Sequence, residues 1–183
     1  MIRVVDDVLT DPHAYRAAAL RKAFGDVTLG DQTFRGIAEA PGAELIAALA
    51  TIAPDFTPTV SFLRRSPLGQ IEPNYIHTDS MMGDMTAIFY LTPQPPPFDG
   101  TIFWRHRPTG TTTAPWTEAL AADARDLSLW ELNRHVGALF NRLLLFSADL
   151  FHSRAIPENY GQGDDSSARL IQVVFGTLPP KAP

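Results

Sequence analysis

The chain has 183 residues, a formal net charge of -5, a pI near 5.4 and no cysteine. This length suits one domain with a substantial core, and the acidic balance argues against a nucleic-acid partner, which needs a basic face. Without cysteine the chain has no disulfide, thiolate zinc site or iron–sulfur cluster, so any metal must be held by histidine and carboxylate groups.

The first residues, 1–7, lack the charged start and apolar run of a secretory signal. No apolar stretch is long enough to span a membrane. We therefore expect a soluble, cytoplasmic protein. The 16 prolines and 12 glycines, with 45% hydrophobic residues, are typical of a β-rich domain with many turns.

The N-terminal part, residues 1–56, is predicted to be a supporting strand and helices. Residues 2–9 have the character of a strand. Asp11 and Pro12 then predict a helix start, because Asp caps free amides and Pro suits the first helical position. This helix is expected to end at Phe24, before a glycine, and a second helix is expected over residues 43–53.

From residue 57 the pattern changes to short strands separated by turns rich in Pro and Gly. The predicted strands are 57–63, 72–79, 85–91, 100–104, 141–146 and 170–175. Residues 109–138 interrupt this pattern, and we interpret them as a helical or irregular insertion. The sequence thus predicts a single domain, 1–183, that is mainly β with flanking α: a jelly roll over 57–178 with N-terminal helices and a helical insertion.

The candidate for chemistry is the pair His77 and Asp79 together with the distant His152. On an extended backbone, residues two apart lie on one face, so the pair presents an imidazole and a carboxylate together. Two imidazoles and one carboxylate with open positions suit non-haem Fe(II). A His-x-acid pair alone is weak evidence, since a chain of this composition is expected to contain about 0.5 such pairs by chance. A structural histidine hydrogen-bonded to a nearby Asp remains the alternative.

The order of the surrounding motifs adds to this evidence. Along the chain come His77-x-Asp79, a strand that ends near Tyr90, the turn Asp99-Gly100, an apolar strand before His152, and Arg169 at the start of a final strand. This order resembles the Fe(II)/2-oxoglutarate-dependent dioxygenase superfamily, most closely its prolyl 4-hydroxylase-like branch, over roughly residues 57–178. The resemblance implies a double-stranded β-helix with the metal at the mouth of the barrel.

By this resemblance, His77, Asp79 and His152 are the iron ligands. Arg169 matches the residue that pairs with the 5-carboxylate of 2-oxoglutarate, and Tyr90 matches a tyrosine that donates to the same group. A charged residue that leads an apolar inward face, as Arg169 does before residues 171, 173 and 175, also needs an anion to meet. Arg154, two residues after the distal histidine, is the rival carboxylate binder.

The activity implied is that of an oxidoreductase which uses Fe(II), 2-oxoglutarate and O₂ to hydroxylate a peptide side chain or a small molecule. Two alternatives stay open: a jelly roll that binds a metal or ligand without turnover, and a cupin-type metalloenzyme that does not need Arg169. Residues 109–138 and 157–167 are the expected lid segments. Asn74 and Met82 are expected at the edge of the pocket.

The remaining histidines have no ligand spacing. His13 and His135 are expected at the surface. His106, between Arg105 and Arg107, is either part of a basic cluster that meets an anionic substrate group or part of a solvated turn. Packing roles are expected for Trp104, Trp116 and Trp130.

Overall fold

The computed structural model describes residues 1–30, 32–66, 69, 75–114, 117–155 and 168–180. Within them the chain is mainly β. The strands are β1 (Ile2–Val5), β2 (Gly25–Leu29), β3 (Gln32–Glu39), β4 (Thr57–Ser66), β5 (Met85–Tyr90), β6 (Gly100–His106), β7 (Trp130–Gly137), β8 (Leu143–Ser147), β9 (His152–Arg154) and β10 (Arg169–Thr177). The helices are α1 (Pro12–Leu20), α2 (Glu44–Ile52), the short α3 (Glu118–Asp123) and the 3-10 turn η1 (Leu127–Leu129).

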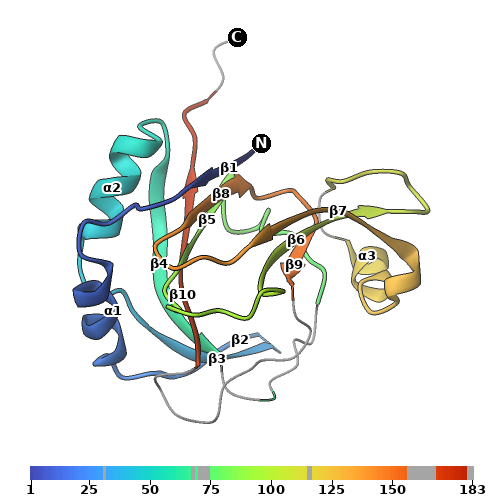
Figure 1. Cartoon of the computed structure of the whole chain (residues 1–183). Coiled ribbons are helices and arrows are strands. Elements are labelled where there is room, and N and C mark those ends of the chain that lie inside the picture. The colour runs from blue at the N-terminus through green and yellow to red at the C-terminus, as the bar shows by residue number, and fades with distance from the viewer. Residues whose placement is uncertain (31, 67–68, 70–74, 115–116, 156–167, 181–183) are drawn as a thin grey trace.

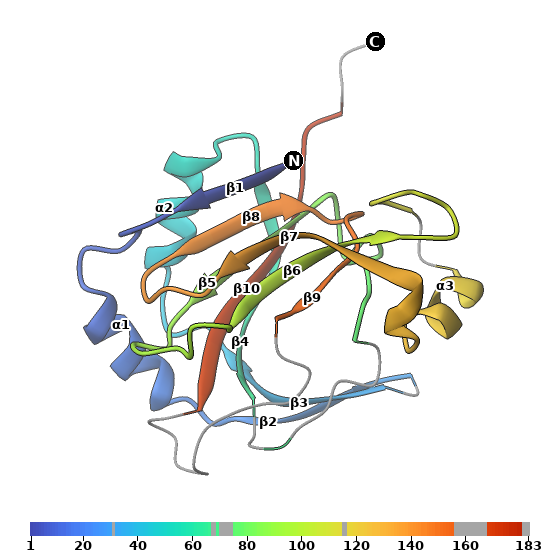
Figure 2. The same cartoon turned by 45° about the vertical axis from the view of Figure 1, so that its right-hand side comes forward.

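The strands form a large and a small antiparallel sheet. The large sheet has seven strands in the order β1-β8-β5-β10-β4-β3-β2, and the small sheet has three in the order β7-β6-β9. Figures 1 and 2 show α1 and α2 against one face of the large sheet, the small sheet over the other face, and α3 beyond the small sheet. None of the helices in the described part of the chain is long and apolar enough to cross a membrane.

Strand alternation divides the core into two layers, as β5 illustrates. Ala87 and Phe89 pack with Tyr15 of α1 on the helical side, while Ile88 and Tyr90 pack with Phe103 of the small sheet on the other. Successive strand residues point to opposite faces, so both faces of this strand are buried. The face toward the small sheet is the one that carries the candidate site.

Helix α1 begins where the sequence predicts. The Asp11 side chain accepts a hydrogen bond from the Ala14 amide at 2.9 Å, and Pro12 takes the first helical position. The helix ends at Leu20 rather than Phe24, because the Arg21 and Lys22 amides bond to carbonyls three residues back, which tightens the last turn. The predicted helix over 43–53 agrees with α2 to within one residue at each end.

Two of the strand assignments that differ from the sequence prediction lie in residues 25–39 and 130–137. Residues 25–39, for which no strand was predicted, form the β2-β3 hairpin, which extends the large sheet through β3 and β4. The insertion expected over 109–138 ends at η1, since β7 pairs with β6 from Trp130 opposite His106 to Gly137 opposite Gly100. Strand β7 is an edge strand whose middle residues are exposed, so its sequence lacks the period of two that marks a half-buried strand.

Candidate metal centre and cavity

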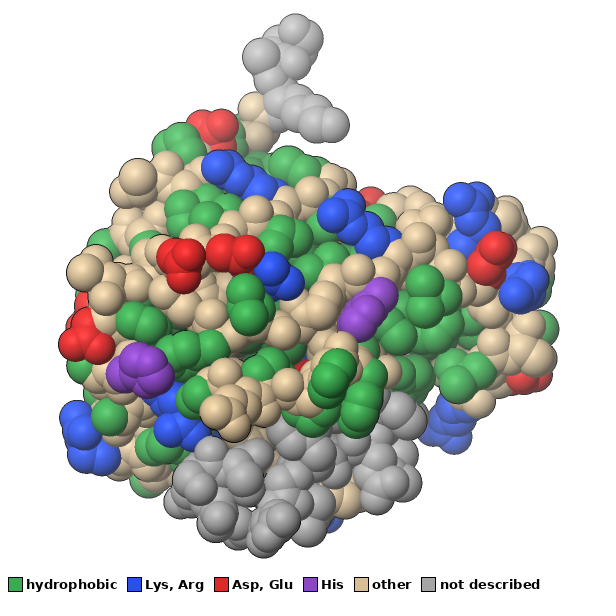
Figure 3. Space-filling view, viewed as in Figure 1, with side chains coloured by type: hydrophobic (Ala, Val, Ile, Leu, Met, Phe, Trp, Pro, Cys, Tyr) green, Lys and Arg blue, Asp and Glu red, His purple; other side chains and the backbone are tan. Residues whose placement is uncertain are grey.

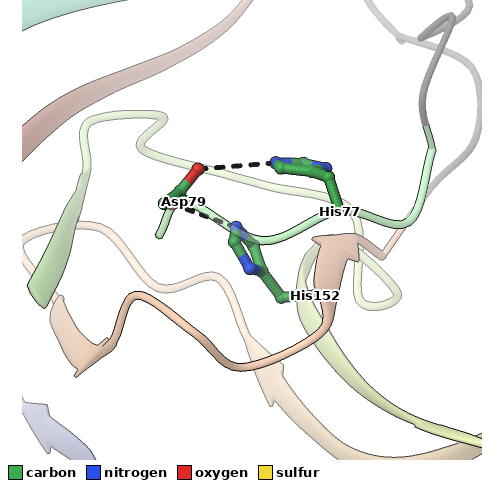
Figure 4. A group of neighbouring side chains, drawn as sticks. All are labelled: His77, Asp79 and His152. Atoms are coloured by element: carbon green, nitrogen blue, oxygen red, sulfur yellow. Dashed lines mark ion pairs between the residues drawn. The ribbon is translucent and has the colours of Figure 1, made fainter. Parts of the chain in front are cut away.

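Three side chains from distant parts of the sequence converge between the two sheets. The candidate ligand atoms of His77, Asp79 and His152 lie within 4.8 Å of one another. The Nε2 atom of His77 is 3.8 Å from Asp79 Oδ1, and the Nε2 atom of His152 is 3.3 Å from Asp79 Oδ2. Figure 4 shows the two imidazole rings and the carboxylate pointing toward one another. Their arrangement matches a set of two imidazoles and one carboxylate.

The backbone fixes these three residues with few hydrogen bonds. His77 and His152 form an isolated antiparallel bridge, with reciprocal N–H to carbonyl bonds of 3.0 and 2.9 Å. The Asp79 amide then donates to the Ala148 carbonyl at 2.7 Å. The strand predicted over 72–79 is therefore wrong in its described part, 75–79, which has one bridge and no ladder; residues 72–74 lie outside the described residues.

The hydrogen bonds of the two histidines suit metal binding through Nε2. His152 Nδ1 lies 2.9 Å from the Leu150 carbonyl oxygen, and His77 Nδ1 lies 3.3 Å from that of Tyr75. A carbonyl only accepts, so these contacts hold a ring proton on Nδ1, and in the neutral imidazole Nε2 would be the atom that binds a metal. Both Nε2 atoms face Asp79. The donor set therefore fits a divalent transition metal.

Asp79 is held as a carboxylate. Burial raises its pKa, but the charge of His152, a hydrogen bond from His152, the charge of His77 and a hydrogen bond from Thr86 together lower the pKa to about 2. The Thr86 hydroxyl donates to Oδ2 at 2.7 Å. For His152, burial lowers the pKa, and the charge of Asp79 with its hydrogen bond outweighs this, so that the pKa is raised. The two groups form a coupled, largely buried ion pair.

A second buried polar cluster surrounds Arg169. Its Nε atom lies 2.9 and 3.2 Å from the two carboxylate oxygens of Asp99, and both side chains are buried. Beside this pair, the hydroxyls of Tyr90 and Thr101 are 2.8 Å apart, and burial raises the pKa of Tyr90 to about 12. Arg169 and Thr101 line the cavity described below. Tyr90 is not among the residues that line the cavity, and the predicted contacts of Arg169 and Tyr90 with a co-substrate carboxylate stay predictions.

Arg154, the rival to Arg169, lies on β9 opposite Thr101 of β6 and also lines the cavity. Both arginines therefore reach the same space from different sheets. Which of them meets a carboxylate stays a prediction.

The two clusters open into one cavity of about 590 Å³ between the sheets. Eleven of its 22 lining residues are aliphatic, Phe or Met side chains, and they come from five strands of the large sheet and the segment after the His-x-Asp pair: Val27, Phe34, Ile37, Val60, Phe62, Ile88, Ile171, Val173, Phe175, Met81 and Met82. A volume of this size suits a small-molecule ligand. Figure 3 shows one face of the molecule, on which hydrophobic side chains gather between the middle and the lobe that carries α3.

The structure confirms some of the other positions predicted from the sequence and contradicts one. Met82 lines the cavity, as expected, and Asn74 lies outside the described residues. His13 and His135 are exposed, as predicted. His106 is neither at the cavity nor solvated: it is 3% exposed, packs on Trp130 and contacts Asp123 at 3.2 Å, so it fastens α3 to β6.

The predicted packing roles hold for the described tryptophans, Trp104 and Trp130, which join one hydrophobic cluster; Trp116 lies outside the described residues. Of the expected lid segments, 157–167 also lies outside them. No described residue of 109–138 lines the cavity.

Sequence reasoning missed the roles of Thr101, Asp99 and Arg64. Thr101 meets Tyr90, Asp99 meets Arg169, and Arg64 of β4 lines the cavity. Of these three, only Asp99 belongs to a pattern that is visible in the sequence, the Asp-Gly turn before an apolar strand. Gly100 has a φ of +145°, which favours glycine, and its amide donates to the Asp99 carboxylate at 2.6 Å.

Several solved structures share this fold. AviO1 from Streptomyces viridochromogenes Tue57 has a TM-score of 0.59 and 16% identity, and the match covers 100% of this chain and 91% of AviO1. Iron-bound HygX from Streptomyces hygroscopicus has a TM-score of 0.61 and 13% identity, with 96% and 82% covered. SnoK, a non-haem alpha-ketoglutarate-dependent carbocyclase from nogalamycin biosynthesis, has a TM-score of 0.58 and 15% identity, with 96% and 79% covered.

A further HygX structure, with a TM-score of 0.57 and 15% identity over the same shares of each chain, contains nickel, 2-oxoglutarate and hygromycin B. At these identities the likeness establishes a shared fold, that of a class which includes non-haem, 2-oxoglutarate-dependent enzymes. The chain itself belongs to family DUF6445, a family of unknown function, whose model matches residues 1–175. Comparison with curated proteins gives no match.

Proposed function

We propose that this protein is an Fe(II)- and 2-oxoglutarate-dependent oxygenase that hydroxylates a small molecule. The observation that carries the proposal is the convergence of His77, Asp79 and His152, with ligand atoms within 4.8 Å of one another, at a cavity also lined by Arg169. Carboxylate and imidazole donors with open positions suit Fe(II). A buried arginine suits a dicarboxylate co-substrate.

The arrangement of the sheets supports the same proposal. We interpret the two facing sheets as a double-stranded β-helix. The three candidate metal ligands would then lie at its mouth, between β9 and β5. The structures of similar fold include one with iron and one with nickel and 2-oxoglutarate. A ligand such as hygromycin B, found in HygX, favours a small molecule over a peptide. Placement in the prolyl 4-hydroxylase-like branch, the single-domain organisation and the cytoplasmic location stay predictions from the sequence.

When bound, iron with 2-oxoglutarate and O₂ supplies an oxidant able to attack an unactivated C–H bond. The protein's own groups would hold the metal and orient the bound molecules. His77, Asp79 and His152 would hold the metal, and Thr86 fixes the Asp79 carboxylate by its 2.7 Å hydrogen bond. Arg169, which lines the same cavity, would pair with the far carboxylate of the co-substrate. The apolar walls exclude water from the reacting groups.

Two measurements test the proposal. Under anaerobic conditions, Fe(II) and 2-oxoglutarate together should give a visible charge-transfer band with the wild type and none with His77→Ala. With O₂ present, the wild type should form succinate from 2-oxoglutarate above the background of the same variant. If neither signal exceeds the variant, even with candidate substrates, the oxygenase assignment is wrong.

The two alternatives make different predictions. A jelly roll that only binds a metal or ligand would give no charge-transfer band and no succinate. A cupin-type metalloenzyme would keep the three ligands but would not need Arg169, so its activity would survive Arg169→Ala. Under our proposal the same substitution weakens 2-oxoglutarate binding and succinate formation together, and a parallel Arg154→Ala variant separates the two candidate carboxylate binders.

A further inference from the structure

The large sheet carries a patch of apolar side chains on the face that lines the cavity. Antiparallel pairing sets Ile88 of β5 opposite Val173 of β10, and Val173 opposite Phe62 of β4. Directly opposite residues share one face of a sheet. Phe175, two residues after Val173, shares this face, and its ring centroid lies 5.9 Å from that of Phe62. All four residues line the cavity, and we call them the apolar floor.

The apolar floor begins beside the candidate metal ligands. Thr86, whose hydroxyl donates to Asp79 at 2.7 Å, lies directly opposite Phe175. On its other side, Phe175 lies opposite Val60 of β4. The Cβ atoms of directly opposite residues are about 5 Å apart. A molecule that lies on the floor would therefore have one part next to Asp79.

The side chains at the opening of the cavity are apolar as well. In the described part of the chain, ten large hydrophobic side chains are exposed, and four of these line the cavity: Val27, Val60, Met81 and Met82. We call these four residues the apolar lip. Met81 is 90% exposed, although it lies only two residues after Asp79. Exposed apolar side chains that gather at a cavity are typical of a binding site.

The backbone fixes the two methionines of the lip beside the metal ligand. The Met82 amide donates to the Asp79 carbonyl at 2.8 Å, and the Asp84 amide donates to the Gly176 carbonyl at 2.9 Å. The segment is thus tied both to Asp79 and to the end of β10. Methionine side chains are unbranched and adapt to irregular apolar shapes. Met81 and Met82 are therefore placed to close over a molecule on the apolar floor.

The described lining leaves no acidic group for a cationic substrate. Asp79 is its only carboxylate, and Asp79 belongs to the candidate metal ligands. An amine buried in the cavity would thus have no anionic partner there. The lining arginines all have interactions within the protein, among them the ion pair of Arg169 with Asp99. Apolar contact, rather than charge, is therefore the main means of recognition along the floor.

The dimensions of the apolar floor suit a ring system. The floor spans three neighbouring strands, β5, β10 and β4, or about 10 Å at about 4.8 Å per strand spacing. Along each strand it extends over two side chains of one face, or roughly 7 Å. A single alkyl chain would cover only part of this width. Fused rings would cover it, and they lose little conformational freedom on binding.

We propose that the substrate is an uncharged small molecule with a fused, largely apolar ring system, which lies on the apolar floor next to Asp79 and is covered by the apolar lip. This inference deepens the proposed oxygenase function and rests on it for the chemistry, but the binding of the rings needs only the cavity. The floor and the lip together determine which molecules the site accepts.

Calorimetry on the full chain tests this substrate class with four probes: naphthalene-2-methanol, naphthalene-2-carboxylate, 2-naphthylmethylamine and octan-1-ol. The first three share one ring system and differ in charge, and the fourth replaces the rings by a chain. Each probe is titrated into metal-free protein and into protein loaded with Ni(II) and 2-oxoglutarate. Naphthalene-2-methanol should bind at least about fivefold more tightly than each other probe, because a charged group loses hydration and a chain loses conformational freedom.

Met81→Ser and Leu132→Ser are the matched variants. Both side chains are exposed, so neither substitution removes core packing, and Leu132 lies on β7, outside the described lining. Met81→Ser should weaken the binding of naphthalene-2-methanol about 3- to 10-fold, since apolar area that covers the ligand is lost. Leu132→Ser should leave its Kd unchanged. Circular dichroism of each variant checks that it is folded.

Binding of the carboxylate or the amine as tight as that of naphthalene-2-methanol would overturn the uncharged class. Equally tight binding of octan-1-ol would overturn the ring system, and an equal effect of the two substitutions would overturn the role of the lip. Failure of the proposed function is distinguishable, because it removes the charge-transfer band and succinate but leaves naphthalene-2-methanol bound to metal-free protein. If the band forms and naphthalene-2-methanol does not bind, the substrate assignment alone fails.

Discussion

Arg169 and Asp99 form a buried ion pair across 70 residues of sequence, in which one Nε–H donates to both carboxylate oxygens at 2.9 and 3.2 Å. Asp99 is 1% exposed and Arg169 is 4% exposed. The carboxylate thus holds the guanidinium through Nε at the start of β10, in the position from which Arg169 lines the cavity. The residue predicted to bind the co-substrate is positioned by an acidic neighbour.

Removing one partner of this ion pair should destabilise the folded protein. We expect Arg169→Met to lower the free energy of unfolding by about 3–5 kcal/mol, because Asp99 is left charged and buried. The double variant Arg169→Met with Asp99→Leu should recover most of that loss. Urea unfolding of the wild type, both single variants and the double variant gives the coupling between the two sites.

The exposed pair Arg142 and Asp6 is the matched control. Its contacts are 2.6 and 2.9 Å, but the Asp6 side chain is 45% exposed, so Arg142→Met should cost only about 1 kcal/mol or less from the ion pair. A loss for Arg169→Met no larger than this control would contradict a structural role for the buried pair.

Thr86 should tune metal affinity. Thr86→Val removes the hydroxyl that donates to Asp79 at 2.7 Å, and we expect affinity for Ni(II) or Fe(II) to fall about 10- to 100-fold. Thr92→Val is the control, because the Thr92 hydroxyl is also buried but bonds to the Leu170 backbone. Metal titration by calorimetry should separate the two variants; equal affinities would show that Thr86 does not orient the ligand.

Tyr90 should affect the co-substrate rather than the metal. We expect Tyr90→Phe to raise the Kd of 2-oxoglutarate about 10-fold, since a buried hydroxyl next to Thr101 and Arg169 is lost. Tyr15→Phe removes an equally buried hydroxyl, bonded to Gln172 at 2.7 Å on the helical side of the sheet. Both variants should keep wild-type affinity for Ni(II). A similar Kd for 2-oxoglutarate in both would rule out Tyr90 as a contact.

The Asp79 and His152 pair should give metal-free protein a pH-dependent stability. The pKa of Asp79 is lowered from 3.8 to about 2, so its contribution is present above about pH 4 and is lost as the pH falls toward 2. The pKa of His152 is raised from 6.5, so its contribution is complete below pH 6.5 and is lost as the pH rises through the raised value. The pair therefore stabilises most between about pH 4 and 6.5, by about 2 kcal/mol.

The measurement is the difference in unfolding free energy between wild type and Asp79→Asn, taken across pH with a chelator present. The two pKa shifts describe one interaction, so they are not added. A difference that keeps growing above pH 7 would contradict the sign of the His152 shift.

The sequence predicted the elements whose signals are local. Asp11 and Pro12 mark the start of α1 because a cap and a fixed φ act within one turn. Alternation over β5 and β10 predicted most of the residues of these strands that face the cavity, because side chains on a strand repeat every two residues; Tyr90 is the exception and does not line it. Strand β7 and the β2-β3 hairpin were missed because both lie at sheet edges, where exposure removes the apolar pattern.

For the candidate site, the sequence by itself determined the donor types and their order: His77, Asp79, His152, and an arginine at the start of the last strand. Their convergence depended on the bridge between His77 and His152, which joins segments 75 residues apart and leaves no local pattern. The pairing of Asp99 with Arg169, and the alignment of Arg64 with Ile171, likewise come from sheet register. Register follows from long-range packing, so only the tertiary structure decided which charges and apolar surfaces share the cavity.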